Sequence, residues 1–332
     1  MNSARLRIYC PCLALLFATS CSADAPTALP RSGGHAAPAQ ASLQLPAAVA
    51  GKVVLVGEDW LSGPRNDYNL SMDADERMLV FARSDADFKD AHIWMARRTD
   101  ADWSTPVEVP FSDSRYKDSD PWLSPDGRVL YFVSNRPVPG TALANGSLDI
   151  WRVSVTEDGF GALEHLPGVS SPKDELGPEM HEGWLYFNSS REGGPAKMAL
   201  YRARVSGNAF DAPTALSAPF NDGRIQGDFT LSPDGRLALF WSQRGGTSGL
   251  DLFVTCRASN SWATPVRLPP PIGNAAMSFT PAFGADGRTL YLSSMRTDAE
   301  ARDTAALMNG QSNLYAAPVD LVRAAVADAC DA

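Results

Sequence analysis

Carboxylates and arginines recur in this sequence at a regular interval and are its best candidates for binding or catalysis. Asp120 lies 16 residues before Arg136, and Asp228 lies 16 residues before Arg244. Two acids about 5–10 Å apart can act as acid and base in glycoside hydrolysis, whereas an acid beside an arginine forms an ion pair. The candidate binding residues are Asp120, Arg136, Glu175, Arg191, Asp228, Arg244 and Arg296. Their roles depend on the elements that position them.

These residues flank a sequence repeat that predicts β-hairpins. The segment LSPDGRVLYFVSNR at 123–136 returns as LSPDGRLALFWSQR at 231–244 and as FGADGRTLYLSSMR at 283–296, with looser copies at 72–85 and 178–191. Pro, Asp and Gly are typical turn residues. The apolar run that follows them is typical of a strand covered on both faces.

The period of the repeat indicates a β-propeller. One apolar residue marks the same strand in every copy, at intervals of 51, 55, 53 and 52 residues: Phe81, Phe132, Phe187, Phe240 and Leu292. A third strand and a short fourth strand follow in most copies, and four strands per period of about 50 residues are typical of a propeller blade. We therefore predict an all-β fold, a β-propeller of five four-stranded blades.

The last copy lacks a clear fourth strand. We expect residues 52–56, which precede the first copy, to complete the last blade, because closing the ring leaves no open sheet edge. The only helix expected in the domain lies near the end of the chain, at 320–329.

The repeat also resembles a known family. The pattern S-P-D-G-x-x-aliphatic-x-aromatic-x-S-x-R is similar to the WD40-like repeat of TolB-like β-propellers, over about residues 68–318. The resemblance implies a periplasmic protein and six blades, whereas the repeat count gives five, so both numbers stay open at this point. Residues 22–66 are too few for the N-terminal α/β domain of the Tol–Pal family member, so that role is not implied.

The N-terminus resembles that of a bacterial lipoprotein. Arg5 and Arg7 precede an apolar run at 8–19, and Ala-Thr-Ser before Cys21 resembles a lipobox. We predict a signal peptide at 1–20, a lipidated Cys21 with an Ala/Pro-rich tether at 21–50, a propeller at 51–320 and a tail at 321–332. Ser22 implies anchoring to the outer membrane, facing the periplasm. Ordinary signal-peptidase cleavage nearby is the alternative.

Composition limits the partners and cofactors. The net charge of −9 argues against binding to nucleic acid, and it leaves the lipid anchor as the only expected membrane contact. The four His are scattered, so no zinc site is expected. No cofactor is predicted, apart from the option of calcium held by oxygen ligands in the central channel. Cys256 and Cys330 form a disulfide, or else one is a buried thiol and the other a tail thiol.

Three functions fit these features. The preferred hypothesis is a non-enzymatic binding or scaffold module, with an envelope protein or peptide docked on the loops around the central channel, two of which are enlarged (137–147 and 297–312). One alternative is a carbohydrate-active glycosidase or lyase that uses Asp120, Glu175 and Asp228. The other is a purely structural envelope component with an empty central funnel, in which each arginine makes an ion pair that ties its hairpin to the neighbouring hairpin.

Overall fold

The computed structural model describes residues 43–100, 102–140, 146–246, 249–258, 261–273, 277–296 and 310–330. Contacts divide the chain into Met1–Ala41 and Ser42–Ala332, and the fold below is that of the second unit. The predicted signal peptide, Cys21 and most of the tether lie outside the described residues, as does most of each enlarged loop.

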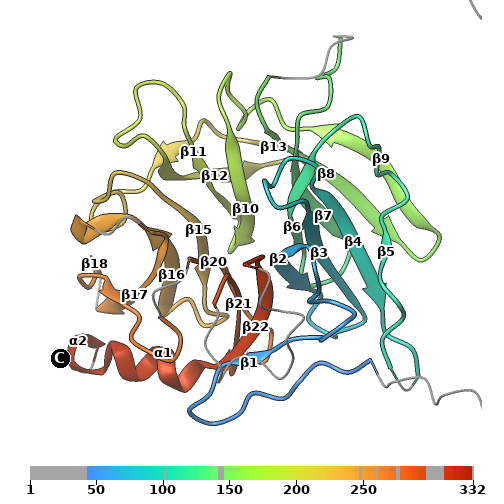
Figure 1. Ribbon diagram of the computed structural model, residues 1–332. Coiled ribbons are helices and arrows are strands. Elements are labelled where there is room, and N and C mark those ends of the chain that lie inside the picture. Colours follow the sequence, from blue (N-terminus) through green and yellow to red (C-terminus); the bar gives the residue numbers. More distant parts are fainter. Residues whose placement is uncertain are drawn as a thin grey trace, which may run out of the picture. The chain divides into compact units, whose positions relative to one another are not determined.

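Five antiparallel sheets stand around a central axis, so the prediction of a five-bladed β-propeller is confirmed (Figure 1). Blade 1 contains β2 (Asn66–Met72), β3 (Met78–Ser84), β4 (His92–Arg97) and β5 (Val107–Glu108). Blade 2 contains β6 (Asp118–Leu123), β7 (Val129–Ser134), β8 (Asp149–Thr156) and β9 (Gly159–His165). The first strand of each blade lies innermost, and the six blades of the TolB-like resemblance are not found.

The other three blades vary at their outer edges. Blade 3 contains β10 (Glu175–His181), β11 (Trp184–Ser189), β12 (Ala199–Ser206), β13 (Ala209–Phe210) and β14 (Thr214–Ala215). Blade 4 contains β15 (Gln226–Leu231), β16 (Leu237–Ser242), a 3-10 turn (Arg244–Gly246), β17 (Asp251–Ala258), β18 (Ser261–Trp262) and β19 (Val266–Arg267). Blade 5 contains β20 (Ser278–Phe283), β21 (Thr289–Ser294), β22 (Asn313–Pro318) and β1 (Val54–Leu55).

The N-terminal strand closes the ring, as the sequence predicts. Strand β1 pairs antiparallel with β22, with Leu55 opposite Tyr315. The Ser62 hydroxyl donates to the Val56 carbonyl at 2.8 Å and accepts from the Leu314 amide at 3.1 Å. The first and last parts of the domain are therefore joined in one sheet, which protects the edge of β22.

The apolar core lies between neighbouring blades. The five residues that mark the repeat are at most 1% exposed: Phe81, Phe132, Phe187, Phe240 and Leu292. Each lies on the second strand of its blade, whose two faces are both covered. Burial of each such side chain contributes on the order of 2–3 kcal/mol.

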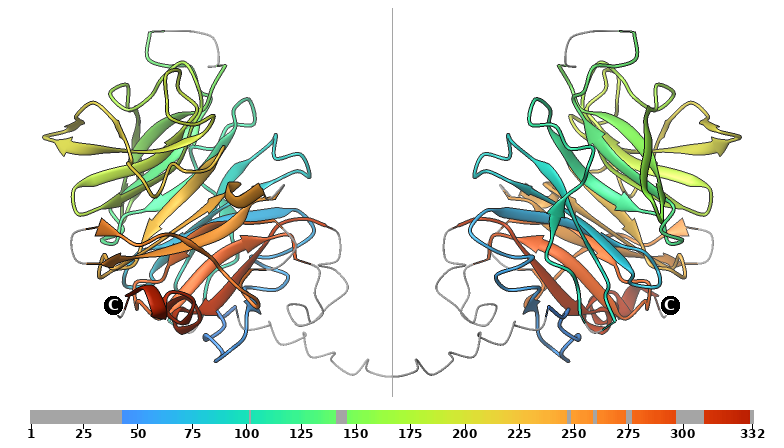
Figure 2. Two further views of the ribbon diagram at one scale, coloured as in Figure 1. Left: turned by 90° about the vertical axis from the view of Figure 1, so that its left-hand side faces the viewer. Right: turned by 90° about the vertical axis from the view of Figure 1, so that its right-hand side faces the viewer.

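Two short helices end the chain, α1 (Val319–Ala325) and α2 (Ala327–Cys330), where the sequence predicts one. Figures 1 and 2, which show the molecule from different sides, both place them beside the strands of blades 4 and 5. Cys330 forms a disulfide with Cys256 of β17, which decides between the two options left open by the sequence. Within the described part of the chain, no helix is long and apolar enough to cross a membrane.

Candidate functional site

Every blade places an arginine near the end of its second strand, with the guanidinium group turned toward the linker that enters the blade. In each case the group donates to a backbone carbonyl of that linker. The donor–acceptor distances are 3.4 Å for Arg83 to Trp60, 2.8 Å for Arg136 to Phe111, 2.6 Å for Arg191 to Val169, 2.9 Å for Arg244 to Pro219 and 2.6 Å for Arg296 to Ile272. The four predicted arginines, together with Arg83 in blade 1, which was not predicted, thus connect each hairpin to its linker.

The acid that pairs with Arg136 is Asp118 and not Asp120. Arg136 Nη2 lies 2.6 Å from Asp118 Oδ2, and the Asp118 side chain is fully buried. The register shifts between Ser119 and Trp122, where a β-bulge adds a residue to the inner strand. Asp120 lies in this bulge, and neither the register on the turn side (Trp122 opposite Tyr131) nor the register beyond it (Asp118 opposite Ser134) places Asp120 opposite Arg136. The 16-residue spacing therefore selects the wrong aspartate.

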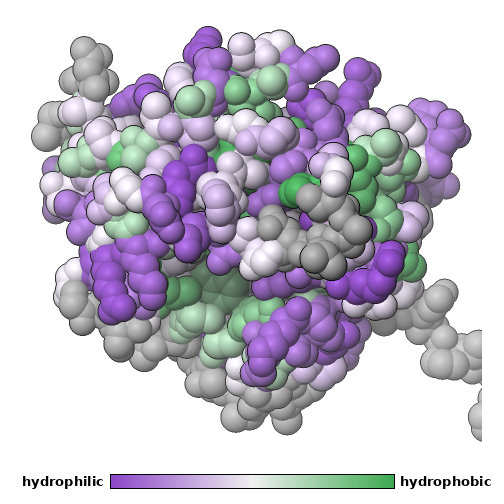
Figure 3. All heavy atoms as spheres, turned by 90° about the horizontal axis from the view of Figure 1, so that it is seen from above, coloured by the Kyte–Doolittle hydropathy of each residue, from purple (hydrophilic) through white to green (hydrophobic). Residues whose placement is uncertain are grey.

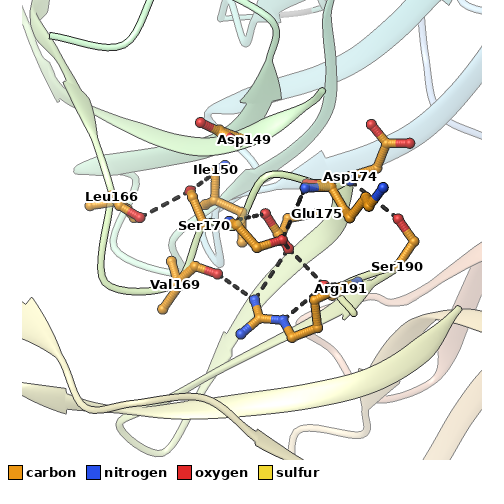
Figure 4. A network of polar contacts seen from close by, with 12 residues as sticks. Asp149, Ile150, Leu166, Val169, Ser170, Asp174, Glu175, Ser190 and Arg191 are labelled. Carbon is orange, nitrogen blue, oxygen red and sulfur yellow. Dashed lines mark hydrogen bonds and ion pairs between the residues drawn. The ribbon is translucent and has the colours of Figure 1, made fainter. Parts of the chain in front are cut away.

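Glu175 and Arg191, two of the candidate binding residues, do meet (Figure 4). Glu175 Oε1 lies 3.2 Å from Arg191 Nη2 and accepts hydrogen bonds from the Ser189 and Ser171 hydroxyls at 2.6 and 2.7 Å. Burial raises the pKa of Glu175, and the hydrogen bonds and the charge of Arg191 oppose that rise. Its partners therefore hold the Glu175 side chain between β11 and the linker that enters blade 3, away from the central axis.

Around the axis, each inner strand carries one residue at its bulge with a positive φ angle. These angles are 53° at Asn69, 49° at Asp120, 56° at Gly177, 50° at Asp228 and 46° at Thr280. Left-handed backbone is easy for glycine, tolerated by Asn and Asp, and strained for β-branched threonine. Asp120 and Asp228 thus share a structural position whose geometry repeats in all five blades.

The bulges are linked from blade to blade by hydrogen bonds. The Gly177 amide donates to Asp120 Oδ2 at 2.9 Å, and the Thr280 amide donates to Asp228 Oδ2 at 3.2 Å. Gly177 has no side chain that could accept from the Asp228 amide of the next blade. Asn188 Oδ1 of β11 accepts from that amide instead, at 3.1 Å. The channel carboxylates therefore satisfy backbone donors of the next blade, which would otherwise be unpaired near the axis.

Asp228 and Asp120 lie close enough to interact. Both approach Gly177: Asp120 accepts its amide, and a β-carbon built on Gly177 would lie 2.8 Å from Asp228 Oδ1. Burial first, and the charge of Asp120 second, raise the pKa of Asp228 to about 7. Of the three predicted catalytic acids, the structure thus brings two together and leaves Glu175 apart.

A further carboxylate of the channel, Glu179, was not predicted. Its Oε1 accepts from the Thr230 hydroxyl at 3.0 Å and from the Leu231 amide at 3.3 Å, and burial raises its pKa to about 8. Asp67 and Asp118 were also missed. Aligning the repeats on their inner strands, in place of their turns, would have put Asp67, Asp118 and Glu175 at one position.

The channel leaves little room for a ligand. The cavity beside Asp228 and Glu179 has a volume of about 40 Å³, compared with roughly 300–1,000 Å³ for small-molecule sites. Among the described residues, no three His, Cys, Asp or Glu side chains lie together as ligands of a metal ion. The channel can hold protons and a few waters, but its described part has no space for a sugar ring.

No family model and no curated protein matches the chain. Solved propellers match its fold at low identity. TolB from Acinetobacter baumannii is 15% identical with a TM-score of 0.46, and the match covers 82% of this chain and 65% of that chain. An alpha-L-arabinofuranosidase from Lactobacillus brevis is 12% identical with a TM-score of 0.52, covering 80% and 92%. A thermostable family-43 glycoside hydrolase is 11% identical with a TM-score of 0.49, covering 78% and 91%. At such identities the likeness shows a shared β-propeller fold and nothing further.

Proposed function

We propose that this protein is a binding β-propeller of the bacterial envelope, which docks a protein or peptide on the loop face. The loop face is the end of the ring built from the described loops 85–91, 111–117, 190–198 and 217–225. One observation carries the proposal: the charged side chains around the axis already have partners in the framework, and the cavity between them is only about 40 Å³. A ligand of any size would therefore contact the exposed loops.

The described surface favours a polar, reversible contact. Large hydrophobic side chains that are exposed are few and scattered: Val49, Val107, Val205 and Val266. Figure 3 shows hydrophilic residues over much of one side, with hydrophobic residues in smaller groups. The loop face carries exposed charges of both signs, including Asp87, Lys89, Arg115, Glu192 and Arg224. Surfaces of this kind are typical of non-obligate protein contacts.

Site-specific photo-crosslinking in cells tests the docking face. A photoreactive residue at Asp87 or Glu192 would probe the loop face, and one at Asp158 or Asp286 would probe the opposite end of the ring, where the hairpin turns lie. All four positions are exposed. We expect a product of the same mass from both loop-face positions and none from the controls. Equal products from both ends, or none from either, would contradict the proposal and favour a purely structural component.

We further propose that Cys21 anchors the protein to the outer membrane on its periplasmic side. The disulfide between Cys256 and Cys330 supports an oxidising compartment, because such bonds rarely persist in the cytosol. Membrane fractionation and labelling with a radioactive fatty acid test the anchor. Replacement of Cys21 by Ala should release the protein into the soluble periplasmic fraction without label, whereas Cys12→Ala is the matched control. Retention of the Cys21 variant in the membrane would reject the anchor.

A carbohydrate-active enzyme is the second candidate, and the electrostatics of the channel favour it. Asp228, with a pKa of about 7, lies near Asp120, and Glu179 has a pKa of about 8. Carboxyl groups whose environments separate their pKa values can divide the roles of acid and base. The small cavity opposes this reading.

A panel of aryl glycosides and oligosaccharides tests the second candidate. If the protein hydrolyses one of them, Asp228→Asn should abolish turnover, and Asp126→Asn in a hairpin turn should not. No turnover by the wild-type protein across the panel would reject this candidate.

A further inference from the structure

Blade 2 has a longer outer strand than the other blades. Strand β9 has seven residues and ends its sheet, with no further strand beside it in the described part of the chain (Figure 1). The outer strands of the other blades, β5, β14, β19 and β1, have two residues each. A long outer strand can pair with another chain through its unpaired backbone groups, and proteins usually shorten or block such an edge.

The pairing of β9 with β8 shows which of its backbone groups face outward. The Leu166 amide donates to the Ile150 carbonyl at 3.0 Å, so the backbone groups of Leu166 face β8. In an antiparallel pair such residues alternate with residues that face away. The register is regular from Leu163 to His165, and it places the N–H and C=O groups of these two residues on the outer side. Within the described residues, neither N–H group makes a hydrogen bond.

Three of the other blades carry a proline where blade 2 carries Leu163. In each blade this position lies three residues before the amide that donates to the third strand. The four donor amides are those of Val109, Leu166, Leu216 and Leu268. The residues three positions earlier are Pro106, Leu163, Pro213 and Pro265. Proline has no N–H group, so it blocks an outer edge at the place where a donor would face outward. Blade 2 keeps that donor.

The two faces of β9 differ in chemistry. Leu163 packs against the apolar cluster between blades 1 and 2. Glu164 lies on the other face, where it pairs with Arg152 at 2.7 Å and stays 55% exposed. The turn of the same hairpin adds two exposed acids, and the only cation between residues 149 and 165 is Arg152. An added strand would therefore meet an apolar face and an acidic one.

We propose that β9 binds an extended segment of a partner protein as an added strand, and that this segment alternates apolar and basic residues. Addition of a strand to an exposed sheet edge is a common way to bind a peptide, and opposite charges at facing positions stabilise it. The bulge at Gly161 and Ala162 ends the pairing before the turn that carries Asp158. The segment thus contacts Leu163 to His165. This edge is not part of the loop face, and the inference does not depend on the function proposed above.

Hydrogen exchange followed by NMR tests the edge, on the full chain with the capped peptide Val-Lys-Val-Lys-Val at millimolar concentration. The amides of Leu163 and His165 should exchange about tenfold more slowly when the peptide occupies about nine-tenths of the protein. Glu108 and Ala215 hold the position of His165 in blades 1 and 3, next to the prolines, and their exchange should not change.

Two variants separate the backbone donor from the charge. Leu163→Pro gives blade 2 the residue of the other blades and should weaken peptide binding at least about tenfold, because it removes an outward donor. Leu163→Val is the matched control, which keeps the N–H group and should bind as the wild type does. Glu164→Gln should weaken binding of the lysine peptide about threefold, the effect of one cross-strand ion pair, and leave binding of Val-Thr-Val-Thr-Val unchanged. Unfolding midpoints show that each variant is folded.

Several results would overturn the proposal. These are no protection of Leu163 and His165, equal protection of Glu108 and Ala215, or tighter binding of Val-Glu-Val-Glu-Val than of the lysine peptide. Protection that increases with protein concentration when no peptide is present would also overturn it, because the occupant of β9 would then be a second copy of this chain. If Leu163→Pro does not fold, the comparison of Glu164→Gln with the wild type still decides: an equal affinity for the lysine peptide rejects the basic partner.

Discussion

In every blade an arginine lies near the linker that enters the blade, but the side chain at the facing inner-strand position differs between blades 1 to 3 and blades 4 and 5. In the first three blades the arginine meets a fully buried acid: Asp67, Asp118 or Glu175. In the other two, Gln226 and Ser278 hold the acid's position. Gln226 donates to the Met198 carbonyl at 2.8 Å, and the Ser278 hydroxyl lies 3.0 Å from that of Ser294.

The difference shows which contact the fold needs. All five arginines donate to linker carbonyls and lie over an aromatic ring, with the closest rings being Trp94, Tyr116, Tyr201, Phe240 and Tyr315. An acid occupies the matching inner-strand position in blades 1 to 3, and Gln226 and Ser278 occupy it in blades 4 and 5. We infer that the arginine serves first to hold the linker and the strand together, and that the acid is an addition whose desolvation offsets much of its attraction.

Blades 4 and 5 are also joined by a covalent link. The disulfide joins β17 of blade 4 to the helices that follow β22 of blade 5. Four predictions test this contrast.

Arg136→Met should have the largest effect. It leaves Asp118 charged and buried without its partner, and loss of one member of a buried ion pair costs about 3–5 kcal/mol. Arg296→Met, the matched change in blade 5, leaves two linker carbonyls without a donor and should cost roughly 2 kcal/mol. Urea unfolding measures both. Equal costs would show that the acid does not matter.

Cys330→Ser should come next, with a loss of about 3 kcal/mol, within the range for native disulfides. Hydrogen exchange should show that the added openings concentrate in β17, β22 and the helices, while blades 1 to 3 stay protected. Uniform loss of protection around the ring would mean that the blades unfold as one unit and would remove the distinction between the two regions.

Glu175→Gln gives blade 3 the amide that blade 4 carries naturally, and it should cost about 1–2 kcal/mol. The amide keeps the size of the side chain and can still accept from Ser189, although one hydrogen-bond acceptor becomes a donor. A loss of unfolding free energy larger than that of Arg136→Met would show that the acid, and not the arginine, holds the strand and the linker together.

The pH dependence of stability tests a single buried acid of blade 1. Burial raises the pKa of Asp67 from 3.8 to about 6, and Arg83 opposes that rise. Between about pH 4 and 6 the folded form therefore holds a proton that the unfolded chain has released. The stabilisation of the folded form by protonated Asp67 is therefore complete below about pH 4, and it is lost as the pH rises to about 6.

Asp67→Asn should remove this slope, which is at most about 1.4 kcal/mol per pH unit for one proton. Gln226→Asn changes a side chain that does not titrate, at the matching position of blade 4, and should leave the slope unchanged. The comparison uses unfolding free energies of the wild type and the two variants between pH 4 and 7. The unfolding free energy of the wild type minus that of Asp67→Asn should fall as the pH rises from 4 to 6. A rise in this difference would contradict the raised pKa of Asp67.

The hairpins, their period and the ring closure could be predicted because they depend on local patterns. Pro-Asp-Gly turns and continuous apolar strands form where their residues occur, and residues 52–56 had no other strand to join. The arginines were found by the same repeat. The 16-residue spacing paired them with the wrong acids in blades 2 and 4, because a count of residues does not show that Asp120 and Asp228 accept hydrogen bonds from the neighbouring blades at the axis.

The sequence by itself determined the β-propeller and the residues of its core, since turn chemistry and hydrophobic period act along the chain. The structure decided between five blades and six. Only the tertiary structure decided which acid meets each arginine, that Asp120 and Asp228 approach each other, and that Cys256 bonds to Cys330. Those contacts join residues from different blades or elements, and their distances depend on how the ring closes.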